Sequence, residues 1–350
     1  MIRHAEAEGN IYRRAHGQFN GQIIGRGFAQ IEQLKDRFRN EKIDAVYSSD
    51  LSRTITTAAA ISKTHGLPVN TTERLREVNV GEWEDIAWGE IRHRYPQMAG
   101  LFNSDPALWN VDGSEEYSQV RERMRDCLKD IGLRHDNETV AVFSHGFATR
   151  SLLCELMDIP SHMTELVPYC DNTAVALLHY ENNRITIQYH GDNSHLLSGF
   201  STFAKQTWWR DEEERRSEDL RYLPFDEDQY AEILNHCSEE SHVQVCANIR
   251  LIAALDDHPA GILGLDTDKG SDKNTGWISQ LYIKPELRRK GFGIQLLGQA
   301  VSEFRRLRRD KLQLEVPAYS PAMNFCARYG FSKIGALNST CLMEKDIRNW

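Results

Sequence analysis

The sequence lacks several features that would place it in a specialised class of protein. None of its seven cysteines forms a Cys-x-x-Cys pair, and their odd number argues against a disulfide framework or a zinc ribbon. It contains no run of about 18 apolar residues, so no transmembrane helix is expected. The first residues hold no apolar segment typical of a signal peptide. These absences predict a cytoplasmic protein with no membrane partner.

An excess of basic residues is also missing. The chain has 42 lysines and arginines against 51 acidic residues and a formal net charge of -9, so a nucleic-acid partner is not expected. Its 40% hydrophobic and 27% charged residues are ordinary for a globular protein. A chain of 350 residues is long enough for two domains, each with its own core. There is no internal repeat, and nothing in the sequence indicates an oligomeric state.

A change in composition marks the expected domain boundary. Residues 210–219 form a charged run without an apolar residue, which is typical of a solvated helix or a linker. We therefore predict a first domain over residues 1–205, a charged linker over residues 206–218 and a second domain over residues 219–350.

Before this boundary, short apolar runs alternate with helical segments. Residues 43–47 and 140–143 are predicted strands, and each is followed by a polar loop and then a predicted helix. Repetition of this order indicates a parallel sheet flanked by helices. Ligands bind at the carboxyl ends of the strands in such sheets, so the polar residues just after each strand are the candidates for a site.

The second half is predicted to be a mixed α/β domain with a central sheet. Its predicted strands cover residues 249–255, 260–266, 277–283 and 311–316, with a helix over residues 294–307.

The polar residues at the predicted strand ends of the first half suit phosphoryl transfer. They are Arg3, His4, Arg53, Glu77 and His145. A neutral imidazole can attack phosphorus, and arginines hold the phosphoryl group through forked donors. A second histidine, protonated, would stabilise charge on the phosphoryl oxygens, and a carboxylic acid would protonate the leaving alkoxide and later activate water. This chemistry needs no metal.

Four blocks of sequence carry a family resemblance. Residues 3–10, Arg-His-Ala-Glu-Ala-Glu-Gly-Asn, resemble the Arg-His-Gly-Glu-Thr-x-x-Asn signature of the histidine phosphatase superfamily. Residues 47–58, 75–83 and 143–146 resemble its second, third and fourth blocks, in the same order. Four blocks in order are a specific signal, whereas each block alone is weak. The resemblance implies a three-layer α/β/α, phosphoglycerate-mutase-like domain.

The resemblance also implies roles for single residues. His4 would be the nucleophile, and Arg3, Arg53 and His145 would form the phosphate pocket, with Asn10 at a position that often touches phosphate. Glu77 would be the proton donor, although Glu73 and Glu82 lie close in sequence and are alternatives for this role. We interpret the other histidines, such as His16, His65 and His93, as surface residues or as supports of the site.

Three features depart from the family pattern. Ala5 replaces a glycine after the nucleophile, and Ala7 replaces a threonine. Only Met1 and Ile2 precede Arg3, where the family has a longer strand, so either the strand begins upstream or it is short and holds His4 less firmly.

The choice between a hydrolase and a mutase rests on the segment after Glu77. Residues 78–83 resemble the hydrolase version of the family and not the basic, aromatic segment of its glycolytic mutases. We predict a phosphomonoester hydrolase that acts on a phosphorylated small molecule through a phosphohistidine on His4. A phosphoglycerate-mutase-type phosphotransferase is the alternative.

A glycine-containing loop in the second half is predicted to bind an anion. It joins a predicted strand to a predicted helix, so backbone N–H groups and the helix N-terminus would face a pyrophosphate. The loop resembles the Arg/Gln-x-x-Gly-x-Gly/Ala signature of the GNAT N-acetyltransferase family, and residues 281–285, 314–316, Ala322 and Gly330-Phe331 also match it. The resemblance implies an α+β domain with a central mixed sheet that uses acetyl-CoA and an amine acceptor.

The cofactor-binding residues implied by this resemblance fall into two groups. The pantetheine and thioester would lie along Leu281, Tyr282 and Ile283, and the pyrophosphate on Arg288, Arg289, Lys290, Gly291, Phe292 and Gly293.

Two residues depart from the GNAT pattern. Cys326 stands where the family often has a tyrosine that protonates the departing thiolate, and Tyr319 replaces a frequent asparagine. Binding of a CoA thioester is therefore better supported than its turnover. Besides a bifunctional enzyme, the alternatives are a phosphatase regulated by a non-catalytic CoA-binding domain and a scaffold in which both sites have decayed.

Overall fold

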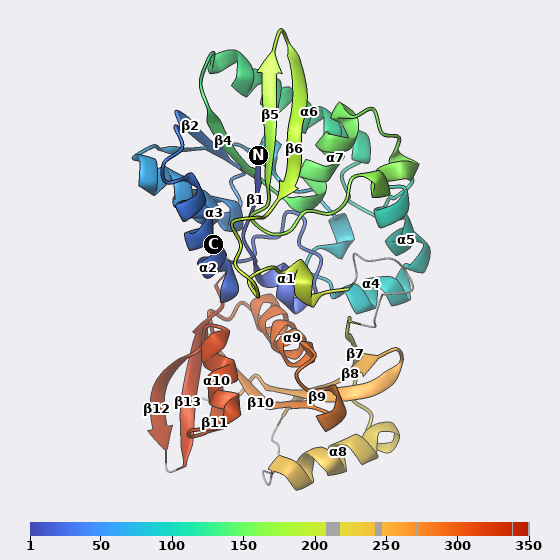
Figure 1. Cartoon of the computed structure of the whole chain (residues 1–350). Helices are drawn as coiled ribbons and strands as arrows, with labels where there is room; N and C mark the ends of the chain where they lie inside the picture. Colours follow the sequence, from blue (N-terminus) through green and yellow to red (C-terminus); the bar gives the residue numbers. More distant parts are fainter. Residues whose placement is uncertain (208–217, 242–246, 270–271, 338, 349–350) are drawn as a thin grey trace. The chain divides into compact units, whose positions relative to one another are not determined.

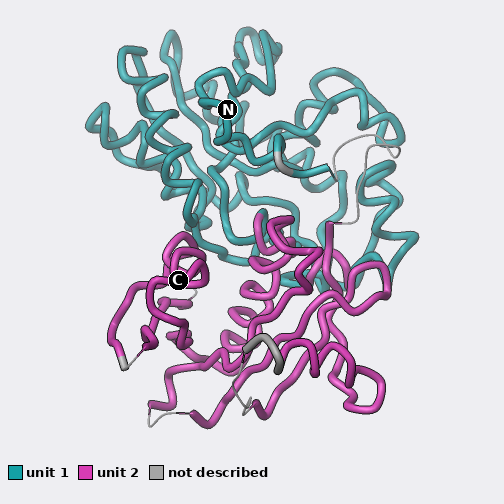
Figure 2. The backbone as a smooth tube through the Cα atoms, turned by 60° about the horizontal axis from the view of Figure 1, so that its bottom comes forward, with its two compact units in different colours: residues 1–10, 15–86, 91–215 teal, residues 11–14, 87–90, 216–350 magenta. Residues whose placement is uncertain are grey.

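A computed structural model describes residues 1–207, 218–241, 247–269, 272–337 and 339–348. The chain divides into two compact units, shown in teal and magenta in Figure 2. The first comprises residues 1–10, 15–86 and 91–215, and the second residues 11–14, 87–90 and 216–350. Most of the predicted linker, residues 208–217, lies outside the described part. Among the described helices, none combines the length and the apolar character that crossing a membrane requires.

The first unit is built on a six-stranded sheet in the order β3-β2-β4-β1-β5-β6. Its strands are β1 (Ile2–Arg3), β2 (Ala45–Ser48), β3 (Val69–Thr71), β4 (Val140–Ser144), β5 (Val175–Glu181) and β6 (Arg184–Asp192). The first four run parallel, as the sequence predicted, but β5 and β6 are antiparallel. Asn182 and Asn183 both have positive φ, 50° and 60°, as a two-residue hairpin turn between these strands requires.

Helices pack on both faces of this sheet. The helices described before the boundary between the units are α1 (Glu8–Tyr12), α2 (Arg26–Phe38), α3 (Ser52–His65), α4 (Trp88–Arg94), α5 (Pro96–Ser104), α6 (Tyr117–Arg134) and α7 (Gly146–Leu156). Helix α2 packs with α3 and α6 packs with α7, and the two pairs flank the sheet on opposite sides in Figure 1. Short 3₁₀ turns lie at Glu73–Leu75, Gly81–Trp83, Ser161–Leu166 and Phe203–Lys205. The result is a three-layer α/β/α unit.

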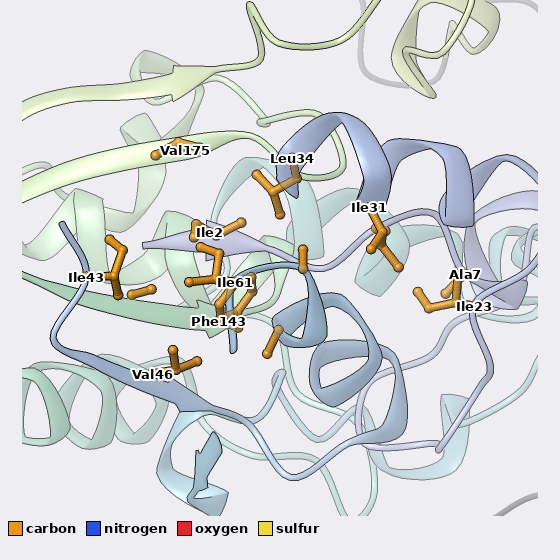
Figure 3. Packing of buried hydrophobic residues seen from close by; sticks show 14 residues of the cluster. Ile2, Ala7, Ile23, Ile31, Leu34, Ile43, Val46, Ile61, Phe143 and Val175 are labelled. Carbon is orange, nitrogen blue, oxygen red and sulfur yellow. The ribbon is translucent and has the colours of Figure 1, made fainter. Parts of the chain in front are cut away.

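The strand that carries His4 is short but central. Ile2 pairs with Phe143 of β4 on one side and with Val175 of β5 on the other, and all three side chains belong to one buried cluster (Figure 3). The backbone N–H of His4 then donates to the carbonyl of Ser144 at 3.0 Å. Two strand residues are therefore enough to hold His4, because neighbouring strands fix them from both sides.

The second unit has a seven-stranded sheet in the order β12-β13-β11-β10-β9-β8-β7. Its strands are β7 (Arg221–Pro224), β8 (Ile249–Leu255), β9 (His258–Asp266), β10 (Thr275–Ile283), β11 (Lys311–Pro317), β12 (Ser332–Leu337) and β13 (Thr340–Asp346). Among its described strands, β10 and β11 pair in parallel and the other neighbours pair antiparallel, so the sheet is mixed, as expected.

In the described part of the second unit, three helices pack on this sheet, and a 3₁₀ turn lies at Pro285–Leu287. The helices are α8 (Glu227–Ser241), α9 (Phe292–Arg306) and α10 (Pro321–Arg328). Helix α8 contributes Tyr230 and Ile233 to a buried cluster that includes Tyr282 of β10. Helix α9 packs on the other face of the sheet (Figure 1). It comes close to the backbone at Gly276, where an added Cβ would lie 2.3 Å from the ring of Phe304. A glycine at this position allows the close approach.

Candidate functional site

His4 lies immediately after β1, and its side chain is 6% exposed. Its Nδ1 atom is 2.7 Å from the carbonyl oxygen of Ala5. A carbonyl only accepts, so Nδ1 carries the hydrogen and Nε2 presents a lone pair. Burial, followed by the charges of Arg53 and Arg3, holds the pKa of His4 well below its usual range. The imidazole is therefore neutral at neutral pH, as a nucleophile must be.

His145 follows β4 at the start of α7, with its ring centroid 5.2 Å from that of His4. Its Nδ1 accepts from Arg53 Nε at 3.2 Å, so its hydrogen is on Nε2, which donates to Ser49 Oγ at 2.9 Å. Burial and the charge of Arg53 hold its pKa well below the usual value. Burial and the neighbouring arginines therefore oppose the positive charge that the sequence analysis expected on this second histidine.

Arg53 is buried in the first turn of α3 and is fixed by three acceptors. Besides His145, it donates from Nη1 to the carbonyl of Phe19 at 2.7 Å and from Nη2 to that of Gly17 at 2.6 Å. Burial lowers its pKa to about 10, so it stays charged at neutral pH. Its guanidinium is held in one orientation before any ligand arrives.

Arg3 provides the second buried guanidinium. It donates from Nη1 to the carbonyl of Cys170, and its Cζ lies 5.4 Å from the ring centroid of Phe203. Its Nε is buried and has no hydrogen-bond partner within the described part of the chain. An added Cβ at Gly146 would lie 3.2 Å from this Nε, so glycine at the start of α7 leaves room for the guanidinium. An unpartnered buried donor of this kind is what an oxyanion would satisfy.

Glu77 is the acidic residue that the structure brings to this group. Its carboxylate accepts the backbone N–H groups of Phe147 at 3.0 Å and Ala148 at 2.7 Å, at the N-terminus of α7 directly after His145. The two sequence alternatives lie elsewhere, since Glu73 pairs with Arg76 at 3.2 Å and Glu82 accepts from Tyr95. Geometry therefore favours Glu77 over both for a role next to the histidines.

Asn10 serves the backbone of the loop that follows His4. Its Oδ1 accepts the N–H of Ala7 at 3.0 Å and lies 3.4 Å from Nδ2 of Asn172. Asn172 in turn donates to the carbonyl of His4 at 2.9 Å. The substituted residue Ala5 fits this loop, because it is fully buried and its N–H donates to Thr57 Oγ1 at 2.9 Å.

Two further residues near the site have supporting positions. The side chain of His16 is buried, with Nε2 3.1 Å from Asp85 Oδ1, and His16 is among the groups that lower the pKa of His4. Of the two readings that the sequence left for His16, a surface residue or a support of the site, this position fits the second. Glu84 accepts the N–H groups of Gln18 and Phe19, and so holds the loop whose carbonyls fix Arg53. No local pattern marks Glu84, because it acts across 66 residues of chain.

Over the described ranges, no group of three or more His, Cys, Asp and Glu side chains is arranged to hold a metal ion.

The predicted anion loop of the second unit lies between β10 and α9. Arg288 Nε donates to the carbonyl of Ile283 at 2.8 Å, Arg289 and Gly291 have positive φ of 64° and 91°, and α9 begins at Phe292. The first N–H groups of a helix have no partner inside the helix, and a positive φ turn beside them forms an anion-binding concavity. Apart from Gly291 and its neighbours in the chain, no heavy atom of the described residues lies within 4 Å of the point that a Cβ on Gly291 would occupy, so this backbone is open to a ligand.

The remaining predicted residues of this loop divide into buried and exposed ones. Tyr282, Ile283 and Phe292 are buried, Leu281 and Gly293 are half-buried, and Lys290 is exposed together with Arg289. The loop therefore presents its backbone, while the side chains of Arg289 and Lys290 are exposed.

Strand β10 separates from its parallel neighbour β11 before it reaches this loop. It pairs with β11 from Thr275 to Ile278, and no pairing follows although both strands continue. A β-bulge between Ile278 and Gln280 lies at the point of divergence. The sheet is therefore open between the two strands near Leu281.

The two departures from the GNAT pattern have different surroundings. Cys326 is 3% exposed in α10, and burial raises the pKa of its thiol to about 11. Tyr319 is 96% exposed and has a positive φ of 59°.

Comparisons with known proteins match two separate regions of the chain to two different families. Residues 1–193 match the model of the histidine phosphatase superfamily (branch 1), and residues 204–331 match that of the acetyltransferase (GNAT) family. Phosphoserine phosphatase 1 of Hydrogenobacter thermophilus is 30% identical over 188 residues, which cover 53% of this chain and 88% of that protein. The metal-independent phosphoserine phosphatase of Arabidopsis thaliana is 30% identical over 57% of this chain and 82% of its own length.

A solved structure extends the likeness to the fold. YhfR of Bacillus stearothermophilus superposes with a TM-score of 0.54 and 28% identity, covering 55% of this chain and 96% of that one. The chain belongs to the histidine phosphatase superfamily (branch 1) through residues 1–193 and carries a GNAT-family acetyltransferase domain in residues 204–331.

Proposed function

We propose that the first unit hydrolyses phosphomonoesters without a metal, through a phosphohistidine on His4. The observation that carries this proposal is the state of His4, whose Nδ1–H is bonded to Ala5 and whose neutral Nε2 lies beside two buried guanidiniums. A lone pair next to fixed positive charge is the arrangement that attack on a phosphoryl group needs.

The first step transfers the phosphoryl group to the protein. His4 Nε2 forms a bond to phosphorus while the bond from phosphorus to the ester oxygen breaks. Arg3 and Arg53 neutralise the phosphoryl oxygens, and the unpartnered Arg3 Nε gains an acceptor. Glu77 gives its proton to the departing alkoxide.

The second step restores the histidine. The Glu77 carboxylate takes a proton from a water molecule, whose oxygen bonds to phosphorus as the bond from phosphorus to Nε2 breaks. Inorganic phosphate leaves, and Glu77 is protonated for the next turnover. His145 becomes protonated when the phosphoryl dianion offsets the two arginines that otherwise lower its pKa.

A small phosphorylated alcohol such as phosphoserine is the proposed substrate class. Two relatives at 30% identity are named phosphoserine phosphatases, one of them metal-independent. An alkoxide is a poor leaving group unless it is protonated as it departs. The position of Glu77 at the site suits proton transfer to this alkoxide.

The test compares phosphoserine, 3-phosphoglycerate and p-nitrophenyl phosphate in the presence of a chelator. We expect phosphate release from phosphoserine by the wild type and a loss of about a thousandfold or more in His4→Ala. Equal rates in both proteins, or inhibition by the chelator, would contradict the proposal. Conversion of 3-phosphoglycerate to its 2-phospho isomer without phosphate release would favour the mutase alternative.

The second unit is proposed to transfer an acetyl group from acetyl-CoA to an amine. The N–H groups at the start of α9 hold the pyrophosphate, and the edge of β10 freed from β11 pairs with the pantetheine. Acetyl-CoA supplies an activated acyl carbon. Because Cys326 is buried and its pKa is raised to about 11, water protonates the departing thiolate instead of this thiol.

Titration calorimetry with acetyl-CoA, followed by measurement of free CoA with a set of amines, tests this activity. Binding together with amine-dependent CoA release is the expected result. Binding without release for any amine would favour the regulatory CoA-binding alternative, which the buried Cys326 motivates.

A further inference from the structure

A single arginine of α6 holds the segment of chain that carries Glu77. Residues 76–79 lie in neither a helix nor a strand, so their backbone groups need hydrogen-bond partners from elsewhere. Arg123 Nη1 donates to the carbonyl of Arg74 at 3.0 Å and to that of Arg76 at 2.7 Å. Its Nη2 donates to the carbonyl of Glu77 at 3.0 Å. The guanidinium therefore fixes the main chain up to the residue proposed as the proton donor.

Glu115 extends this support to the other side of Glu77. Arg123 Nε donates to Glu115 Oε1 at 2.5 Å, and Arg123 Nη2 donates to Oε2 at 2.9 Å. The same Oε2 accepts the backbone N–H of Asn79 at 3.3 Å, and the N–H of Glu115 donates to the carbonyl of Asn79 at 2.9 Å. The ion pair therefore holds the chain both before and after Glu77.

The hydrogen bonds of Arg123 use the full capacity of a guanidinium. Its five N–H donors are directed at three backbone carbonyls and at the two oxygens of Glu115. A lysine has its donors on one nitrogen atom and cannot reproduce this fork. The carboxylate of Glu77 is held separately, by the N–H groups of Phe147 and Ala148. Helix α6 thus fixes the backbone of Glu77, and α7 fixes its side chain.

The position of the ion pair suits a role in geometry more than in stability. The side chains of Arg123 and Glu115 are 17% and 15% exposed, so both charges have lost most of their water. The cost of removing that water offsets much of the attraction between two such charges. What the pair adds is direction, because each of its hydrogen bonds restrains one backbone group beside Glu77.

We propose that Arg123, together with Glu115, is a positioning residue for the proton transfers of Glu77. The proposal rests on the phosphatase function proposed above. Arg123 touches no reacting atom; it keeps the Glu77 carboxyl within hydrogen-bond distance of the ester oxygen in the first step and of the attacking water in the second. A displacement of about 1 Å is enough to slow such a transfer strongly. Capture of the phosphoryl group depends on Arg3 and Arg53 and is not affected.

The dependence of the rate on the leaving group tests this role on the full chain. The value of kcat/KM reports the first step, in which an alkoxide needs a proton and nitrophenolate does not. In Arg123→Met, kcat/KM should fall by about thirtyfold for phosphoserine and by less than about threefold for p-nitrophenyl phosphate, with phenyl phosphate between them. A fall by the same factor for all three esters is the pattern of a general loss of structure and would overturn the proposal.

A charge-conserving variant separates the fork of Arg123 from its charge. Burial and the charge of Arg53 lower the pKa of His145, and the charge of Arg123 adds to this effect, so its loss could act through that histidine. Arg123→Lys keeps the charge but not the fork, and it should still lower kcat/KM for phosphoserine by about tenfold. Wild-type kcat/KM for phosphoserine in Arg123→Lys would assign the effect to charge and overturn the proposal.

Glu115→Gln is the milder variant if Arg123→Met does not fold. It keeps the shape of the side chain and one acceptor oxygen, but the hydrogen bonds from Arg123 lose their ionic partner. We expect a fall in kcat/KM of about threefold for phosphoserine and no change for p-nitrophenyl phosphate. Unchanged values for both esters in Glu115→Gln and in Arg123→Lys would overturn the proposal.

Arg125→Met is the matched control on the same helix. Arg125 pairs with Glu155 of α7 at 2.6 Å and with Asp126, so its loss should change kcat/KM for none of the three esters. The outcomes also separate this role from the activity itself. Hydrolysis that depends on His4 but shows the wild-type dependence on the leaving group in Arg123→Met would overturn the positioning role alone. Hydrolysis that does not depend on His4 would refute the phosphatase mechanism, and the positioning role with it.

Discussion

The two regions proposed to bind phosphate groups use different atoms. The first unit surrounds its site with buried side chains, among them Arg3, Arg53 and His145, each fixed by neighbouring backbone or side-chain groups. The second unit offers the backbone of Arg289 to Gly293, and the basic side chains of that loop are exposed. A site made of side chains should be lost by truncating one of them, whereas a site made of backbone should respond to changes in chain conformation.

The largest expected effect is the difference between two arginine substitutions, one in each site. Arg53→Ala should lower kcat/KM for the phosphomonoester by about a thousandfold, because it removes a buried cation that orients the phosphoryl oxygens. Arg289→Ala should raise the KM for acetyl-CoA by less than about threefold, because that side chain is exposed. Steady-state kinetics of both activities measure this contrast. Similar losses in the two variants would remove the distinction between the sites.

The next effect concerns the carboxylate at the N-terminus of α7. Glu77→Gln should reduce turnover of phosphoserine by about a hundredfold but that of p-nitrophenyl phosphate by less than about tenfold, since nitrophenolate leaves without a proton. Glu82→Gln is the matched control, because Glu82 bonds to Tyr95 away from the histidines. If the turnover of both esters falls by the same factor in Glu77→Gln, this residue is not the proton donor.

A glycine substitution tests the backbone site. Gly291 has a φ of 91°, which a β-branched residue adopts only with strain, so Gly291→Val should raise the KM for acetyl-CoA by about tenfold. Gly66→Val is the control, because Gly66 also has a positive φ, 67°, and open space around it, but lies at the end of α3 in the first unit. An equal effect of the two substitutions on acetyl-CoA would contradict a direct role of the 288–293 loop.

The smallest effect is the pH dependence of stability in the first unit. Burial lowers the pKa of His195 to about 4, so below pH 6.5 the unfolded chain binds a proton that the native chain does not. The free energy of unfolding should therefore fall by about 0.5 kcal/mol more between pH 6.5 and 5.5 in the wild type than in His195→Asn, after allowance for solvent screening of a partly exposed side chain. Urea denaturation followed at both pH values measures this difference. Parallel losses in the two proteins would show that His195 is not neutral in the native state.

Much of the first site was predictable because its residues lie in contiguous blocks of sequence. Arg3, His4, Arg53 and His145 each stand at or near a strand end, and the parallel sheet brings these ends together. What the blocks do not contain is the support from distant segments. Glu84 holds the loop that fixes Arg53, and the bond from Arg53 to His145 decides the protonation of that histidine.

In the second unit too, only part of the site could be predicted from the sequence. The loop over residues 288–293 is visible as a glycine pattern between a strand and a helix. The β-bulge at Ser279 and Gln280 is not, because it depends on how β10 pairs with β9, and pairing between strands leaves no local signal in one of them. The point at which β10 separates from β11 could therefore be read only from the structure.

The measurement that tests the account most directly is capture of the phosphorylated intermediate. Wild-type protein mixed with a phosphomonoester and stopped at alkaline pH within milliseconds should carry an acid-labile phosphoryl group on the peptide that contains His4. The His4→Ala variant should carry none and should release no phosphate above background. A phosphoryl group on another residue, or full turnover without His4, would contradict the account.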